Sequence, residues 1–227
     1  MKLSVLLVAI LAGSASLASA SPVCTTLSTM NQFVALGAGG CTYNDLLFSN
    51  FLYAGTKAGT GVAVPAVNVT LSFVGGGTSN EGIIFASTGW FVNTSSPTLA
   101  SYVDSSIQFA VSTLSHAALI DDADMLLLSA STTGAGKATI GETVNPGGYS
   151  LTVKASGPLA SEVYFPKTST VSVIKDLRVS LPAASSGSAQ INSFEEDFSV
   201  APEPAGMALI GSGLVLLGLW RRRAARG

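Results

Sequence analysis

Asp121, Asp122 and Asp124 form the one acidic cluster that lies between predicted strands. Their hard carboxylate oxygens are the ligands that Ca²⁺ prefers outside the cell. The spacing matches no EF-hand loop, and Asp also favours turns because its side chain hydrogen-bonds to nearby backbone groups. We therefore favour a solvated turn with capping aspartates and keep the three residues as the candidate metal ligands. No cofactor is predicted.

Other residue patterns argue against an enzyme. His116 is the sole histidine, so a triad, a dyad or a multi-histidine metal site lacks its other members. No Gly-x-Ser-x-Gly elbow lies between residues 21 and 199. Carboxylates such as Asp104 and Glu142 cannot be placed on one hydrolytic site from sequence. The Gly134–Lys137 segment lacks the first glycine and the final hydroxyl of a phosphate loop and is typical of a hairpin turn.

Aromatic side chains are the remaining candidates for binding, because β-sandwich proteins often stack sugars on exposed rings. We favour a core position for most of them, since aromatics supply much of the buried area of a core. The candidates are Trp90, Phe91, Tyr102, Tyr149, Tyr164 and Phe165.

The N-terminus carries the pattern of a signal peptide. Lys2 precedes an apolar run from Leu3 to Leu17, which glycine and serine residues interrupt. Ala18 and Ala20 supply the small residues that signal peptidase requires, so we expect cleavage after Ala20. Residues 1–20 are therefore assigned to a signal helix and the chain to the exported class.

The C-terminus carries a second membrane signal. An apolar stretch over residues 205–220 is followed by a basic end, residues 221–227, that contains Arg221, Arg222 and Arg223. These sixteen residues would span about 24 Å as a helix, somewhat less than a bilayer core of about 30 Å, so spanning requires local thinning or snorkelling arginines. Positive charge stays on the cytoplasmic side, which predicts that everything before Pro202 lies outside.

Pro202, Glu203 and Pro204 stand immediately before this apolar stretch. The two prolines forbid a regular helix and hold the preceding backbone extended, as a protease requires. The motif, the Gly- and Leu-rich helix and the terminal arginines resemble the PEP-CTERM sorting signal. The family's frequent small or hydroxyl residue after the second proline is Ala205 here. The resemblance implies processing by an exosortase, a membrane-embedded enzyme that removes the tail near the motif.

A looser resemblance to the same family covers residues 39–51, where a cysteine precedes an aromatic-rich first strand. It supports the processing class and implies no activity. Cys24 and Cys41 are the only cysteines, and an exported chain folds in an oxidising compartment, so we predict a disulfide between them. Free thiols and pairing between molecules are the alternatives.

The central segment, residues 21–199, has the length of one β domain. Its periodicity is 2 over most of its length, so each strand has an apolar and a polar face. About ten short strands are expected, which predicts a mostly β fold, an antiparallel and jelly-roll-like β-sandwich. The strands are expected at 67–73, 82–86, 90–93, 107–112, 124–130, 137–144, 151–154, 162–165, 171–181 and 190–200.

One short helix is expected near residues 27–36, because Leu27, Met30 and Val34 share a helical face and Gly37 can end it. The chain thus divides into a signal peptide (1–20), an extracellular β domain (21–199) and a sorting tail (200–227). Between Ser21 and Ser199 twelve acidic residues outnumber six basic ones, a net charge of −6, which argues against a nucleic-acid partner.

These observations favour an exported, non-enzymatic protein of the bacterial cell surface or extracellular matrix. Its expected partners are the membrane through the C-terminal helix, and signal peptidase and exosortase as processing enzymes. An inner-membrane-anchored intermediate would precede the cell-surface or extracellular form. The alternative is a module that binds exopolysaccharide, with Ca²⁺ at Asp121, Asp122 and Asp124 as a variant of that hypothesis.

Overall fold

The computed structural model describes residues 21–75, 80–94, 98–115 and 118–202. The strands in this part of the chain are β1 (Cys41–Tyr43), β2 (Leu46–Ala58), β3 (Thr70–Val74), β4 (Asn80–Ala86), β5 (Phe91–Val92), β6 (Ser101–Thr113), β7 (Ala118–Gly134), β8 (Lys137–Asn145), β9 (Tyr149–Lys154), β10 (Ala160–Thr168), β11 (Thr170–Leu181) and β12 (Gly187–Pro202). The helical elements described are η1 (Cys24–Thr26), α1 (Met30–Leu36), η2 (Gly37–Gly39) and η3 (Ala66–Asn68).

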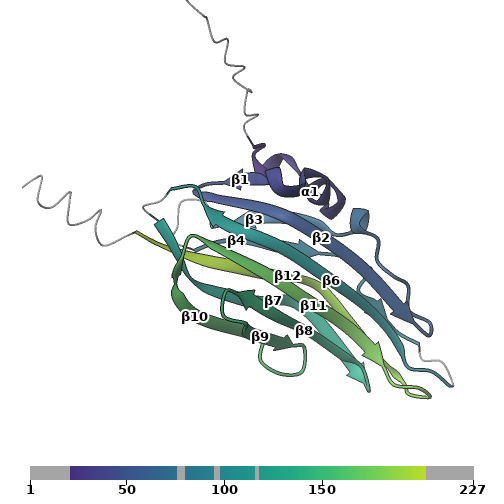
Figure 1. Cartoon of the computed structure of the whole chain (residues 1–227). Helices are drawn as coiled ribbons and strands as arrows, with labels where there is room; N and C mark the ends of the chain where they lie inside the picture. Colours follow the sequence, from purple (N-terminus) through teal and green to yellow (C-terminus); the bar gives the residue numbers. More distant parts are fainter. Residues whose placement is uncertain (1–20, 76–79, 95–97, 116–117, 203–227) are drawn as a thin grey trace, which may run out of the picture.

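The strands form two antiparallel sheets, which confirms the predicted β-sandwich (Figure 1). The first sheet has the order β1-β2-β6-β11-β8-β9. The second sheet has the order β10-β7-β12-β4-β3, and β5 also pairs with β12. The long strands of both sheets run in roughly the same direction in Figure 1, so their inner faces pack along most of their length.

The core is built by strict alternation along these strands. On β11, Val171, Val173, Leu177 and Val179 are buried while their neighbours face outward. Aromatic rings fill the space between the sheets, and the fully buried rings are those of Phe33, Phe48, Phe51, Phe85, Trp90, Phe194 and Phe198. Full burial of each Phe side chain contributes about 1.5–3 kcal/mol, so this layer supplies much of the driving force for folding.

β2 was expected only from the family resemblance, because its apolar residues do not recur at every second position. The pairing of β2 with β6 shifts register between Ser49 and Leu52. Asn50 lies there with a φ of 55°, in the left-handed region. The extra residue brings both Phe48 and Phe51 into the core although they are three residues apart. A β-bulge therefore breaks the two-residue repeat that sequence reading relies on.

The predicted helix is present but begins at Met30, three residues later than expected. Thr29 is its N-cap, and the Gln32 side chain accepts a hydrogen bond from the Thr29 backbone N–H at 3.1 Å. Gly37 ends it with a φ of 55°, which favours glycine. Gly37 therefore fulfils the role that the sequence predicted for it.

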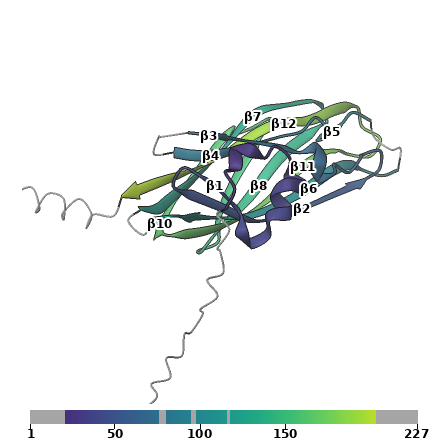
Figure 2. The same cartoon turned by 90° about the horizontal axis from the view of Figure 1, so that it is seen from above.

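α1 closes one open side of the sandwich. Its Phe33 ring lies 5.2 Å from the ring of Phe51 on β2 and 5.8 Å from that of Phe73 on β3. These two strands belong to different sheets and lie at the same side of the molecule. In Figure 2, which views the molecule from above, the purple N-terminal segment, including the helix, lies in front of the strands. The helix thus covers the gap that two sheets leave at their edges.

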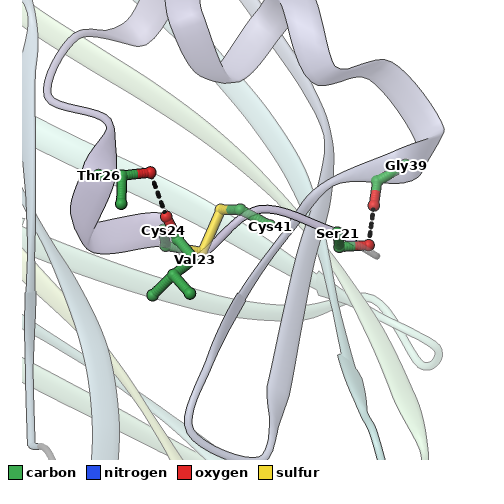
Figure 3. The surroundings of a disulfide bond; sticks show 6 residues. All are labelled: Ser21, Val23, Cys24, Thr26, Gly39 and Cys41. Atoms are coloured by element: carbon green, nitrogen blue, oxygen red, sulfur yellow. Dashed lines mark hydrogen bonds between the residues drawn. A yellow bond between two sulfur atoms is a disulfide. The ribbon is translucent and has the colours of Figure 1, made fainter. Parts of the chain in front are cut away.

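The predicted disulfide is confirmed. Cys24 and Cys41 are bonded, with their Cα atoms 4.9 Å apart (Figure 3). The bond ties η1 to the start of β1, and both cysteines are fully buried. Next to it, Ser21 donates a hydrogen bond from its hydroxyl to the Gly39 carbonyl oxygen at 2.9 Å. Ser21 is therefore fixed to η2 beside the disulfide.

The predicted turn at residues 121–124 is wrong, because these residues lie inside β7, a strand of 17 residues. The strands are also longer than the expected short ones. Within the described ranges, no helix is both long and apolar enough to cross a bilayer. The helix predicted at 205–220, like residues 1–20 and His116, lies outside the described residues.

Candidate functional site

Three ionisable side chains meet inside the sandwich, although sequence reading singled out none of them as a buried group. Lys175 lies on β11 and Glu142 on β8, and the two residues are directly opposite each other in the first sheet. Glu196 lies on β12 in the second sheet and reaches the same point from the other side. We call Lys175, Glu142 and Glu196 the core triad.

Alternation explains why these residues point inward. Lys175 occupies the core-facing position between Val173 and Leu177, and Glu196 the one between Phe194 and Phe198. Because side chains on a strand alternate between the two faces, a charged residue in an apolar set is forced into the core. This is the signal by which the sequence could have revealed the triad.

The contacts within the triad are direct. Lys175 Nζ donates to Glu196 Oε2 at 2.6 Å and also contacts Glu142 Oε2. All three side chains have no exposed surface. The Oε1 atoms of both glutamates are buried without a hydrogen-bond partner among the described residues. Each carboxyl group therefore has one oxygen engaged by the lysine and one oxygen left over.

The rest of the Lys175 environment is weakly polar. The sulfur of Met125 lies 3.8 Å from Nζ, and the centre of the Phe194 ring lies 5.6 Å from it. These groups stabilise a cation less well than water does, because a desolvated cation–π contact is worth about 2 kcal/mol or more, whereas removing a charge from water costs several kcal/mol. The triad therefore sits in a dry, low-dielectric site.

Burial shifts the ionisation of the triad. It lowers the pKa of Lys175, against the attraction of Glu196. It also raises the pKa of Glu196 to about 7, because loss of solvation outweighs the attraction of Lys175. Both shifts favour the uncharged forms.

The three aspartates predicted as candidate metal ligands each contact a different partner. Asp121 forms an ion pair with Lys167 at 3.9 Å, and Asp122 accepts a hydrogen bond from the Ser199 backbone N–H at 2.9 Å. Asp124 lies opposite Asp197 on β12 and opposite Glu162 on β10. Within the described part of the chain, no three His, Cys, Asp or Glu side chains are grouped so that they could hold a metal ion.

Asp124 and Asp197 nevertheless lie opposite each other on the outer face of the second sheet, where their like charges repel. Burial, together with the charges of Glu162 and Asp122, raises the pKa of Asp124. Burial, followed by the charges of Glu195 and Asp124, raises the pKa of Asp197 to about 7. This face therefore carries carboxyl groups that resist ionisation.

The candidate sugar-binding aromatics do not form one platform. Trp90 and Phe165 are buried, while Phe91 on β5 and Tyr164 on β10 are exposed. Through their partners on β12 and β7, these two rings align with Ser131 and Asp122, nine residues apart along β7. That separation corresponds to about 30 Å, too far to stack a short glycan together. Tyr102 lies on the other sheet, 4.3 Å from the Arg178 guanidinium.

The predicted sorting motif begins at the last residue of β12. β12 extends to Pro202, which lies opposite Ala118 at the start of β7. The central strand of the second sheet thus runs up to the first residue of the motif. Glu203, Pro204, Arg221, Arg222 and Arg223, and the predicted cleavage residues Ala18 and Ala20, lie outside the described residues.

Comparison with known proteins identifies no family. No family model matches the chain, and no curated protein does. Among solved structures, a similar one is TmCBM61, a carbohydrate-binding module in complex with β-1,4-galactotriose. The match is 14% identical, covers 66% of this chain and 88% of that chain, and has a TM-score of 0.31. A score of this size does not establish a shared fold.

Proposed function

We propose that this chain is an exported, non-enzymatic cell-surface or matrix protein whose β-sandwich is released from, or transferred off, a membrane-bound intermediate by an exosortase. In this proposal signal peptidase cuts after Ala20 and exosortase cuts near Pro202–Pro204. The tail over 205–220 anchors the intermediate, and Arg221, Arg222 and Arg223 hold its end in the cytoplasm.

The observation that carries the proposal is the agreement between the folded domain and the two predicted processing points. Ser21, the residue after the predicted signal cleavage, is hydrogen-bonded to Gly39. At the other end β12 pairs with β7 as far as Pro202, the first motif residue. Removal of residues 1–20 and 203–227 would therefore leave every strand of the described sandwich in place. The Cys24–Cys41 disulfide also fits an oxidising destination.

The test is mass spectrometry of the mature protein from a host that has an exosortase and from its exosortase-deletion strain. We expect an N-terminus at Ser21 in both strains, and a C-terminus between Pro202 and Ala205 only where the enzyme is present. Glu203→Ala should leave the tail uncut in the first strain, while the surface control Lys57→Ala should be processed normally. Recovery of Arg226 on the mature wild-type protein of that strain would refute the sorting proposal.

Binding of exopolysaccharide is the alternative. The exposed aromatic residues within the described ranges do not gather on one face, so the structural role ranks first. A glycan array with and without chelator separates the two hypotheses. A calcium-dependent signal that is lost in Asp122→Asn would favour the binding module.

A further inference from the structure

The core triad places a nucleophile between two carboxyl groups in a site that water does not reach. Nζ of Lys175 contacts an oxygen of Glu142 and an oxygen of Glu196, and all three side chains are fully buried. We propose that the folded domain cross-links itself here by an amide bond between Lys175 Nζ and Glu142 Cδ, with Glu196 transferring the proton. This inference does not depend on how the tail is processed.

Register makes Glu142 the acyl partner. Lys175 and Glu142 are opposite each other on neighbouring strands, so their backbones fix both side chains on one face at one level of the sheet. Two reactive groups held in this way behave as if at very high local concentration, with effective molarities of about 10⁵ M or more in well-oriented cases. Glu196 comes from the opposite sheet and accepts a hydrogen bond from Lys175, so it is placed to exchange protons with the reacting pair.

The reaction balances without any further reagent. Lys175 reacts as the neutral amine and Glu142 as the neutral acid, a pair formed from the ion pair by transfer of one proton. Nζ attacks Cδ, and the carboxylate of Glu196 accepts a proton from the nitrogen. Glu196 then gives a proton to the departing hydroxyl, the C–O bond breaks, and one water leaves. The products are one amide, one water and the regenerated Glu196 carboxylate.

The environment favours each of these steps. Burial lowers the pKa of Lys175, which makes the neutral amine accessible, and raises the pKa of Glu196 to about 7, where a group can both take and give a proton. The unpartnered Oε1 atoms of both glutamates are available for proton transfer. The apolar surroundings exclude the water that would hydrolyse the product. The amide also removes a buried charge pair, whose desolvation is costly.

The test is a peptide map of the full chain, purified in detergent from an exporting strain that lacks exosortase. After reduction and trypsin digestion we expect one branched peptide in which residues 138–154 are joined to residues 168–178. Its mass should be the sum of the two peptides less one water, and trypsin should not cut after Lys175. Recovery of unmodified 138–154 together with cleavage after Lys175 would overturn the proposal. A branch to Glu196 would overturn the choice of acyl partner.

Three variants test whether these side chains take part in the cross-linking reaction or only stabilise the fold. Glu196→Gln keeps the amine and the acyl partner, and pulse-chase mass spectrometry should show cross-linking slowed about a hundredfold or more. Lys175→Met should abolish the water loss. The matched control is Asp104→Asn, which removes the partner of Arg178 on the outer face of the same sheet and should cross-link completely. Cross-linking at the wild-type rate in Glu196→Gln, with native circular dichroism, would refute the role of Glu196.

Discussion

At the scale of single residues, the position on a strand decides whether a side chain is buried, even when the residue is charged. Lys175, Glu142 and Glu196 are charged residues at core-facing positions, and they can remain there only because they meet one another. Burying an unpaired charge costs several kcal/mol, whereas a matched cluster offsets much of that cost. Asp197 on the outer face has no such matched cluster, and one of its oxygens is buried without a partner among the described residues.

The ionisation of Asp197 gives a pH prediction. Its pKa is raised from 3.8 to about 7, mainly by burial and then by Glu195 and Asp124. A raised pKa means that the folded state favours the protonated form, so this stability is complete below about pH 4 and is lost as the pH rises to about 7. Asp197→Asn should therefore stabilise the domain at pH 8 by about 1–2 kcal/mol after solvent screening, with no gain near pH 4.

Urea unfolding at pH 4, 6 and 8 measures this difference. The control is Lys57→Gln, which removes an exposed charge on β2 of the other sheet. It should leave the pH dependence as in the wild type. Parallel stability curves for Asp197→Asn and the wild type across this range would show that the Asp197 carboxyl group ionises normally.

At the scale of elements, β12 connects most of the features described above. It pairs with β7, β4 and β5, supplies Glu196 to the core triad and Asp197 to the outer face, and ends at Pro202. In the N-terminal part of the domain, α1 and the disulfide fasten the first described residues to the sandwich edge. Hydrogen bonds, strand pairing and the disulfide thus hold the chain to the sandwich beside both predicted processing points.

The disulfide carries a stability prediction at this scale. Its cysteines are 17 residues apart, and in the chain-entropy model closing such a loop stabilises the folded state by about 3 kcal/mol. Cys24→Ala with Cys41→Ala should therefore lower the free energy of unfolding by about that amount. Urea unfolding with and without reductant measures it. Reductant should destabilise the wild type and leave the double variant unchanged, so equal sensitivity of both proteins would contradict the prediction.

At the scale of the whole molecule, the sandwich carries a net charge of −6 over residues 21–199, and four of the five basic residues outside it lie at the C-terminal end. This asymmetry is the basis of the predicted orientation, with the domain outside and the arginines inside. It also separates the protein from nucleic-acid binders, because phosphate recognition needs positive charge on the folded domain.

Cysteine labelling tests that orientation in a strain without exosortase. In intact spheroplasts a membrane-impermeant maleimide should label Lys57→Cys, which is at an exposed position on β2, and should not label Gly227→Cys. Both should be labelled after detergent is added. Labelling of Gly227→Cys in intact spheroplasts would place the C-terminus outside and remove the basis of the sorting proposal.

Local patterns in the sequence were sufficient for the β class, the disulfide pair and the end of α1 at Gly37. These follow from strand periodicity, from the even count of cysteines in a chain predicted to be exported and from the backbone freedom of glycine. They were insufficient for β2, where a bulge interrupts the repeat, and for Asp121, Asp122 and Asp124, whose composition indicates a turn although they pair within β7.

Only the tertiary structure could reveal the core triad and the dispersal of the exposed aromatics. The alternation along β8, β11 and β12 shows which side chains point inward, but it does not show which strands are neighbours or which sheets face each other. Those relations depend on pairings between residues far apart in the chain, such as Lys175 with Glu142 and, across the core, with Glu196. Along β8, β11 and β12 the sequence determined which side chains point inward, and packing decided what each one meets.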